Sequence, residues 1–120
     1  MRYLITVVHD GPEPDPETVP AELHEAMGAF VSQLAADGVL VDAAGLAPVE
    51  KATRIDLRGG KVAVVDGPFA ETKEWIGGYF ILNVESEAKA IEHAKHSVEL
   101  HRTHFPGFDI SHEVRQIMDE

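Results

Sequence analysis

Two amphipathic stripes with helical spacing, set between runs of strand-forming residues, constrain the fold of this chain most strongly. The first stripe predicts a helix over residues 19–37, and its apolar residues recur at spacings of four, three and four: Leu23, Met27, Phe30 and Leu34. Pro20 suits the first turn of this helix, and Gly38 suits its C-terminal end. The second stripe predicts a helix over about residues 87–101 behind an N-cap at Ser86, and its buried residues should be Ile91, Ala94 and Val98.

The segments around these helices predict β-strands. The expected strands cover residues 2–9, 39–41, 46–49, 52–57, 61–65, 78–84 and 109–117. The turn signal Arg58-Gly59-Gly60 predicts an inserted β-hairpin. Without the hairpin the order is βαββαβ, which is the ferredoxin-like α+β arrangement with both helices on one face of an antiparallel sheet.

The second face of this sheet also needs a cover. Tyr3 with Leu4, and Tyr79 with Phe80, place bulky side chains on both faces of their strands. Two helices can cover only one face, so a second copy of the chain is the simplest cover for the other. We therefore expect a homodimer.

Length and composition set further limits. A chain of 120 residues with 44% apolar residues suits one soluble globular domain over residues 1–120. The absence of cysteine excludes a disulfide framework, a thiolate metal site and a cysteine nucleophile. There is no apolar run of membrane-spanning length and no signal-peptide pattern, so we expect a cytoplasmic protein without a membrane partner.

The charge of the chain argues against polyanionic partners. The formal net charge is −11, and no cluster of lysine or arginine interrupts the acidic character. Such a chain repels phosphate backbones and anionic lipids. We expect no nucleic-acid partner.

Residues 66–80 carry the densest chemistry of the sequence, because a turn, charged groups and aromatic rings follow one another there. Loops of this kind on a rigid scaffold often carry function. The expected ligand-binding residues are Phe69, Glu71, Lys73, Glu74 and Tyr79, with a small polar metabolite as the ligand. The alternative is structural: a solvated loop with weak ion pairs, and aromatic rings in the core or in a dimer interface.

Two residues are expected to act as proton acceptors if the site is catalytic. His9 ends the first strand, and Asp66 begins the turn. The alternative for Asp66 is that its carboxylate caps its own turn. Lys73 would hold an anionic group of the ligand.

Seven histidines raise the question of a metal site. His93 and His96, like His101 and His104, are three residues apart, so each pair could share a helix face. There is no HExxH motif and no carboxylate at a recognised ligand spacing. We therefore expect solvated helix histidines, no metal and no cofactor.

The chain resembles the DGPF branch of the YCII-related family. The resemblance is carried by Asp66-Gly67-Pro68-Phe69-Ala70-Glu71-Thr72-Lys73-Glu74 and by Gly77-Gly78-Tyr79. Shorter matches support it in the right order: Gly38-Val39-Leu40, Gly45-Leu46 with Pro48, and Glu113-Val114-Arg115.

The resemblance implies a ferredoxin-like fold that dimerises into an α/β barrel, and members of largely uncharacterised function. Some members are encoded beside extracytoplasmic-function sigma factors, which implies a non-catalytic regulatory module as the alternative to a small enzyme or binding domain. Other members carry a histidine on the first helix, at the place that Met27 occupies here. His24 lies one turn earlier on the same helix.

Overall fold

A computed structural model of the protein describes residues 1–67 and 74–119. The helices are α1 (Ala21–Ala36) and α2 (Glu87–His104). The strands are β1 (Arg2–Asp10), β2 (Leu40–Gly45), β3 (Thr53–Arg58), β4 (Lys61–Asp66), β5 (Glu74–Asn83) and β6 (Ser111–Gln116). Two short 3₁₀ turns are η1 (Pro16–Thr18) and η2 (Val49–Lys51).

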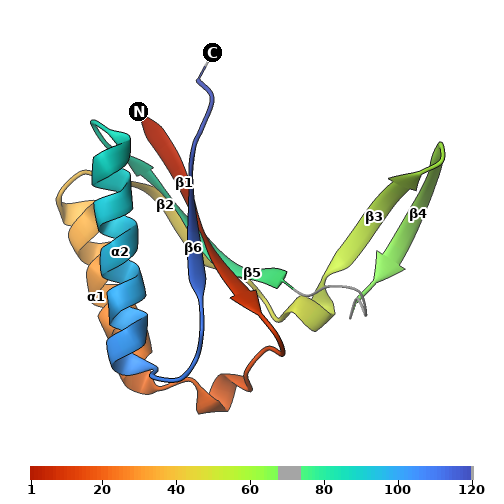
Figure 1. The fold of residues 1–120 in the computed structure, drawn as a ribbon, viewed down its shortest axis with the longest axis horizontal. Helices are drawn as coiled ribbons and strands as arrows, with labels where there is room; N and C mark the ends of the chain where they lie inside the picture. Colours follow the sequence, from red (N-terminus) through yellow and green to blue (C-terminus); the bar gives the residue numbers. More distant parts are fainter. Residues whose placement is uncertain (68–73, 120) are drawn as a thin grey trace.

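Four strands form one sheet in the order β2-β5-β1-β6, and each neighbouring pair is antiparallel. Both helices lie on the same face of this sheet (Figure 1). The chain therefore has an α+β fold with two helices and an antiparallel sheet, consistent with the expected ferredoxin-like arrangement.

Two strand predictions need correction. Residues 46–49 were expected as a strand, but β2 ends at Gly45 and η2 begins at Val49, directly after Pro48, which has no N–H to donate. β5 begins at Glu74 rather than at residue 78. It runs through the Gly-Gly pair because the pairing register with β1 shifts there, between Val7 and Val8.

The core lies between the helices and the sheet. The stripe of α1 is confirmed, since Leu23, Phe30 and Leu34 are buried and Met27 packs against the core. The sheet contributes four core side chains from its two central strands: Tyr3, Ile5, Phe80 and Leu82. Neither helix, nor any other in the described ranges, combines the length and the apolar character needed to cross a membrane.

The predicted stripe of α2 is correct at Ala94, which is buried, but Ile91 is exposed and Val98 is only half-buried. Ile91 is 36% exposed, whereas the buried residues of α2 are Ala90, Ala94, Ser97 and His101. Small side chains let the helix approach the sheet closely, and the two polar residues have hydrogen-bond partners inside the protein. The helix also continues through His104, where a break was expected.

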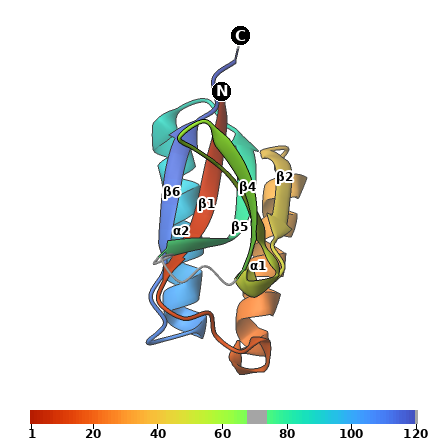
Figure 2. The same ribbon diagram turned by 90° about the vertical axis from the view of Figure 1, so that its right-hand side faces the viewer.

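β3 and β4 form a separate two-stranded sheet connected at Gly59 and Gly60. Both glycines have positive φ, of 58° and 77°, as this type of turn requires. The hairpin extends away from the four-stranded sheet on the side opposite the helices, and the view turned by 90° agrees (Figures 1 and 2).

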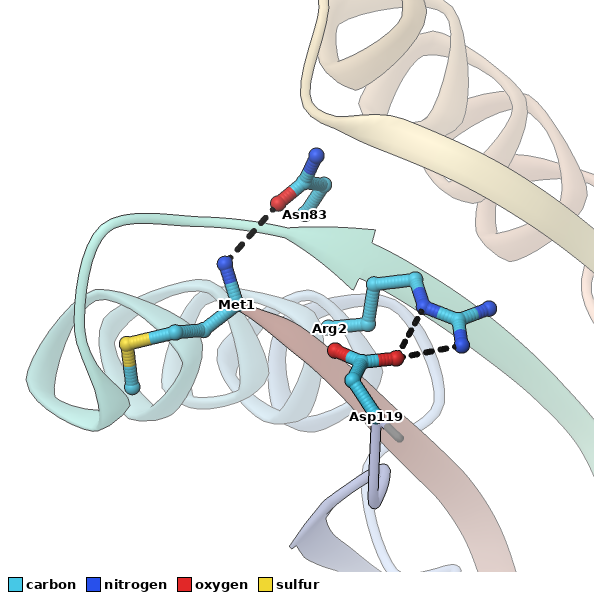
Figure 3. Close-up of polar contacts among 4 residues, drawn as sticks. All are labelled: Met1, Arg2, Asn83 and Asp119. Carbon is cyan, nitrogen blue, oxygen red and sulfur yellow. Dashed lines mark hydrogen bonds and ion pairs between the residues drawn. The ribbon is translucent and has the colours of Figure 1, made fainter.

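Polar contacts tie the two chain ends to each other and to the end of β5 (Figure 3). The amino group of Met1 donates to Oδ1 of Asn83 at 3.1 Å. The guanidinium of Arg2 donates to Oδ1 of Asp119 from Nη2 at 2.6 Å and from Nε at 3.1 Å. Since these groups are exposed, the pair contributes little to stability.

Candidate functional site

A cavity of about 680 Å³ lies where the helices and the sheet diverge, within the usual size range of small-molecule sites. Its lining comes from β1, the connection between β1 and α1, α1, β2 and the residues after it, β5, α2 and the segment after α2. Most lining side chains are apolar, among them Val7, Leu23, Met27, Val31, Phe80 and Phe105. Its ionisable side chains with the clearest acid–base potential are His9, Glu13, His24 and His101.

His9 is the buried polar group of this cavity. It is 9% exposed and lies at the end of β1. Its ring stacks on Trp75 with the centroids 4.4 Å apart, and the ring of Phe108 lies at 5.2 Å. Its Nδ1 atom is buried and has no hydrogen-bond partner in the described part of the chain. A buried nitrogen without a partner is costly and is a recurrent feature of functional sites.

The surroundings keep His9 neutral at physiological pH. Burial lowers the pKa of His9 below its ordinary value of 6.5, and the nearby His101 lowers it further. Glu13, the backbone of Asp109 and Asp10 raise the pKa, but their effects are smaller than that of burial. A neutral imidazole can accept a proton.

Two neighbours fix the His9 ring in place. The indole Nε1 of Trp75 donates to the carbonyl of Gly11 at 2.8 Å, which ties the aromatic partner of His9 to the loop after β1. Gly77 leaves the space that the imidazole fills, since a Cβ atom there would lie 2.9 Å from Nε2 of His9. The Gly-Gly pair of the sequence motif therefore serves the site through its first glycine.

A second histidine network connects α2 to β6 beside the cavity. Nδ1 of His101 lies 2.8 Å from the carbonyl oxygen of Ser97, and Oγ of Ser97 lies 2.7 Å from Nε2 of His112. Nδ1 of His112 lies 3.1 Å from the carbonyl oxygen of Ser111. Carbonyl oxygens only accept, so each imidazole carries its proton on Nδ1 and keeps Nε2 as an acceptor. Ser97 then donates its hydroxyl proton to His112.

Burial also lowers the pKa of both histidines in this network. The pKa of His112 falls to about 4, mainly through burial, and the hydrogen bond to Ser111 opposes the shift only in part. Burial likewise lowers the pKa of His101. His101 is only 9% exposed, so the expectation of solvated helix histidines is wrong for this residue.

The predicted site residues do not all gather at one place. His9 lines the cavity and Tyr79 borders it, although the Tyr79 hydroxyl donates to Oδ2 of Asp42 at 2.8 Å. This hydrogen bond is the main reason why the pKa of Tyr79 is raised. Glu74 is exposed at the start of β5 and pairs in register with Asp10. The other predicted ligand contacts lie outside the described residues: Phe69, Glu71 and Lys73.

The described part of the Asp66-Gly67 turn lies at the base of the hairpin. Oδ1 of Asp66 accepts a hydrogen bond from the hydroxyl of Thr53 at 3.3 Å, and Asp66 does not line the His9 cavity. A Cβ atom on Gly67 would meet three backbone carbonyl oxygens at 3.0–3.1 Å. The position therefore requires glycine for close packing rather than for an unusual φ.

Sequence reasoning missed His101 and the aromatic residues after α2. Ser97 and His101 continue the spacing of Ala90 and Ala94, so the small-residue stripe contained the signal. Apolarity alone selected the neighbouring stripe. Phe105 and Phe108 follow the helix, where periodicity ends, and their stacked rings at 4.7 Å became visible only in the structure.

No group of three or more His, Asp or Glu side chains in residues 1–67 and 74–119 is placed to hold a metal ion. His101 and His104 share α2, but His101 bonds to Ser97. The absence of a bound metal stays a prediction.

The fold and the cavity define a small α+β protein with a buried histidine site between sheet and helices. The YCII-related domain matches residues 1–100, and the chain belongs to this family. Over 58 residues the chain is 36% identical to an uncharacterised protein of Rhizobium meliloti (strain 1021). The matched segment covers 48% of this chain and 47% of that relative. The match thus spans about half the length of the curated relative.

Proposed function

We propose that this protein binds a small molecule in the His9 cavity. The observation that carries the proposal is the buried His9 imidazole, which stacks on Trp75 and keeps an unpartnered Nδ1 beside a cavity of about 680 Å³. The lining is mainly apolar, which suits a ligand with a flat apolar body and one polar group. The proposed ligand is thus more apolar than the small polar metabolite expected from the sequence.

Any chemistry in this cavity would be acid–base chemistry. His9 is the proposed proton acceptor, because its lowered pKa leaves the ring neutral near pH 7. His101 supplies a second neutral imidazole from the opposite layer, and its Nδ1 is already committed to Ser97. In relatives that carry a histidine on the first helix, the corresponding place here is Met27, which also lines this cavity. In this chain, His101 on α2 would take over the role of the histidine that those relatives carry on the first helix.

A thermal-shift screen with heteroaromatic acids, alcohols and amines tests this proposal. A ligand at 100 times its Kd should stabilise the wild type by roughly 2.7 kcal/mol. The variant His9→Phe keeps a ring against Trp75 but loses both nitrogens, so it should fold and respond much less. His93→Gln, away from the cavity lining, is the matched control and should respond like the wild type. An equal response of His9→Phe would refute the assignment of this residue.

We further propose that residues 1–120 form one cytoplasmic domain of the DGPF branch and that two copies pack through their sheet faces into an α/β barrel, with the hairpin as an insertion. The support is the sheet face opposite the helices, where Leu4, Val8 and Ile81 are only partly covered and Ile76 is 49% exposed. This surface also favours the alternative function, a dimeric interaction module connected with sigma-factor signalling. Such a module would dimerise while showing no response in the ligand screen.

A further inference from the structure

The β3–β4 hairpin has an apolar face that no described residue covers. Its four large apolar side chains are between 68% and 72% exposed: Ile55, Leu57, Val62 and Val64. Ile55 lies opposite Val64, and Leu57 lies opposite Val62. The two pairs are two residues apart on each strand, so all four side chains lie on one face of the hairpin. β3 and β4 have extensive contacts with each other. Among the described residues, neither strand has extensive contacts with any other helix or strand.

The opposite face of the hairpin is polar. Nε of Arg54 lies 2.9 Å from Oδ1 of Asp56, and Nε of Arg58 lies 3.9 Å from Oδ2 of Asp56. The hairpin is therefore amphipathic, with the polar face suited to water and the apolar face exposed. A two-stranded hairpin alone is marginally stable in water, and a contiguous exposed apolar patch usually marks an interface.

A second apolar face, which is only partly covered, lies on the four-stranded sheet on the side away from α1 and α2. The registers of β1 with β5 place six side chains on it: Leu4, Thr6, Val8, Ile76, Tyr79 and Ile81. The hairpin extends on the same side of the sheet (Figures 1 and 2). One chain thus presents both an apolar arm and an apolar platform, which is the self-complementarity that a twofold-symmetric pair requires.

The charge distribution favours a second copy as the occupant. From Thr53 to Asp66 the hairpin has three basic and two acidic side chains, which gives it a formal charge of +1. The whole chain has a formal net charge of −11, so the rest of the chain carries −12. The three basic side chains lie on the polar face of the hairpin, so the attraction of this weakly basic arm to a strongly acidic body acts at long range. Another copy of this chain offers such a body together with the apolar platform.

We infer that the β3–β4 hairpin is a dimerisation arm, whose apolar face packs on the exposed sheet face of a second copy of the chain. This inference rests on the proposed homodimer and adds that the β3–β4 hairpin stabilises the dimer. Each arm crosses to the partner, so the two contacts are equivalent. The arm also covers the platform residues that the sheet faces alone leave exposed.

Sedimentation equilibrium of the full chain tests the arm. The double variant Leu57→Lys with Val62→Lys should weaken the dimer by roughly 100-fold or more, because two central apolar contacts are lost. Ala63→Lys adds a charge on the polar face of the same hairpin and should leave the dimer intact. A double variant that dimerises like the wild type would overturn the arm, while Ile81→Lys separately reports on the sheet face.

Disulfide trapping identifies the surface of the partner that the hairpin contacts. The method suits this chain because it contains no cysteine of its own. A mixture of Leu57→Cys and Ile76→Cys chains should form a crosslinked heterodimer under mild oxidation, whereas Ala63→Cys with Ile76→Cys should not. Equal crosslinking of both mixtures would contradict the inference. A monomeric wild type would reject both the arm and the proposed homodimer, and binding of that monomer to anionic lipid vesicles would assign the apolar face to a membrane.

Discussion

At the scale of single residues, Gly77 and His9 depend on each other. A Cβ atom at position 77 would lie 2.9 Å from Nε2 of His9, so Gly77→Ala must displace the imidazole from its stack on Trp75. We expect a loss of about 1–3 kcal/mol in unfolding free energy and a changed tryptophan fluorescence spectrum. Gly28→Ala is the control, because a Cβ atom there meets nothing within 4 Å, and it should be neutral or stabilising. An unchanged spectrum for Gly77→Ala would contradict this account of His9.

The buried histidines also predict how stability depends on pH. His112 has a pKa of about 4 in the folded protein against 6.5 as its ordinary value. Between these values the unfolded chain binds more protons, so stability falls as the pH drops from about 6.5 to 4, by about 3 kcal/mol for this residue. His9 and His101 act in the same direction.

Urea unfolding at several pH values measures this dependence. His112→Gln should flatten it substantially, whereas His24→Gln, at an exposed position of α1, should not. A wild type whose stability is constant between pH 6.5 and 4 would show that the network is not buried in solution.

At the scale of elements, α2 is stabilised at its first turn by Ser86. The Ser86 hydroxyl accepts a hydrogen bond from the backbone N–H of Lys89 at 3.2 Å, so the N-cap expected from the sequence is present. Ser86→Ala should lower the unfolding free energy by about 1 kcal/mol, while Ser86→Asp should retain most of it. Chemical denaturation measures these differences in stability. A Ser86→Ala variant as stable as the wild type would contradict the assignment of Ser86 as the N-cap.

The two helices differ in how far their sequences determine their packing. The stripe of α1 could be predicted because its buried side chains are large and apolar. The stripe of α2 could be predicted only in part, because two of its buried residues are polar. Ser97 bonds to His112 across the helix–sheet interface, and His101 bonds to the carbonyl of Ser97 one turn earlier in the same helix. The same difference applies to the site. The position of His9 at a strand end made it a candidate, but the cavity forms from segments spread along the chain from Val7 to Phe108.

At the scale of the whole molecule, the described chain is unevenly covered. One sheet face has two helices over a continuous core, and the other face and the hairpin retain exposed apolar side chains. The proposed homodimer would remove this asymmetry by placing the uncovered faces against each other. The His9 cavity lies mainly on the helix side of the sheet, so the proposed ligand binding and the proposed dimerisation would use different faces of one sheet.

The separation of the two surfaces leads to a prediction. Lys substitution at Leu57 and Val62 should weaken dimerisation but leave the ligand response of the isolated chain largely intact, since neither residue lines the cavity. Isothermal titration calorimetry of the variant with a ligand from the screen measures this. A complete loss of binding in the folded variant would show that the partner completes the site.

The binding of a small molecule beside His9 is the central claim, and nuclear magnetic resonance of the imidazole groups tests it most directly. The seven histidines, labelled with ¹⁵N, report from distinct places in the fold. On titration with the strongest ligand of the screen, we expect large changes in the signals of His9 and His101 and small changes in those of His93 and His96. Saturable binding that leaves the His9 signal unchanged would contradict it.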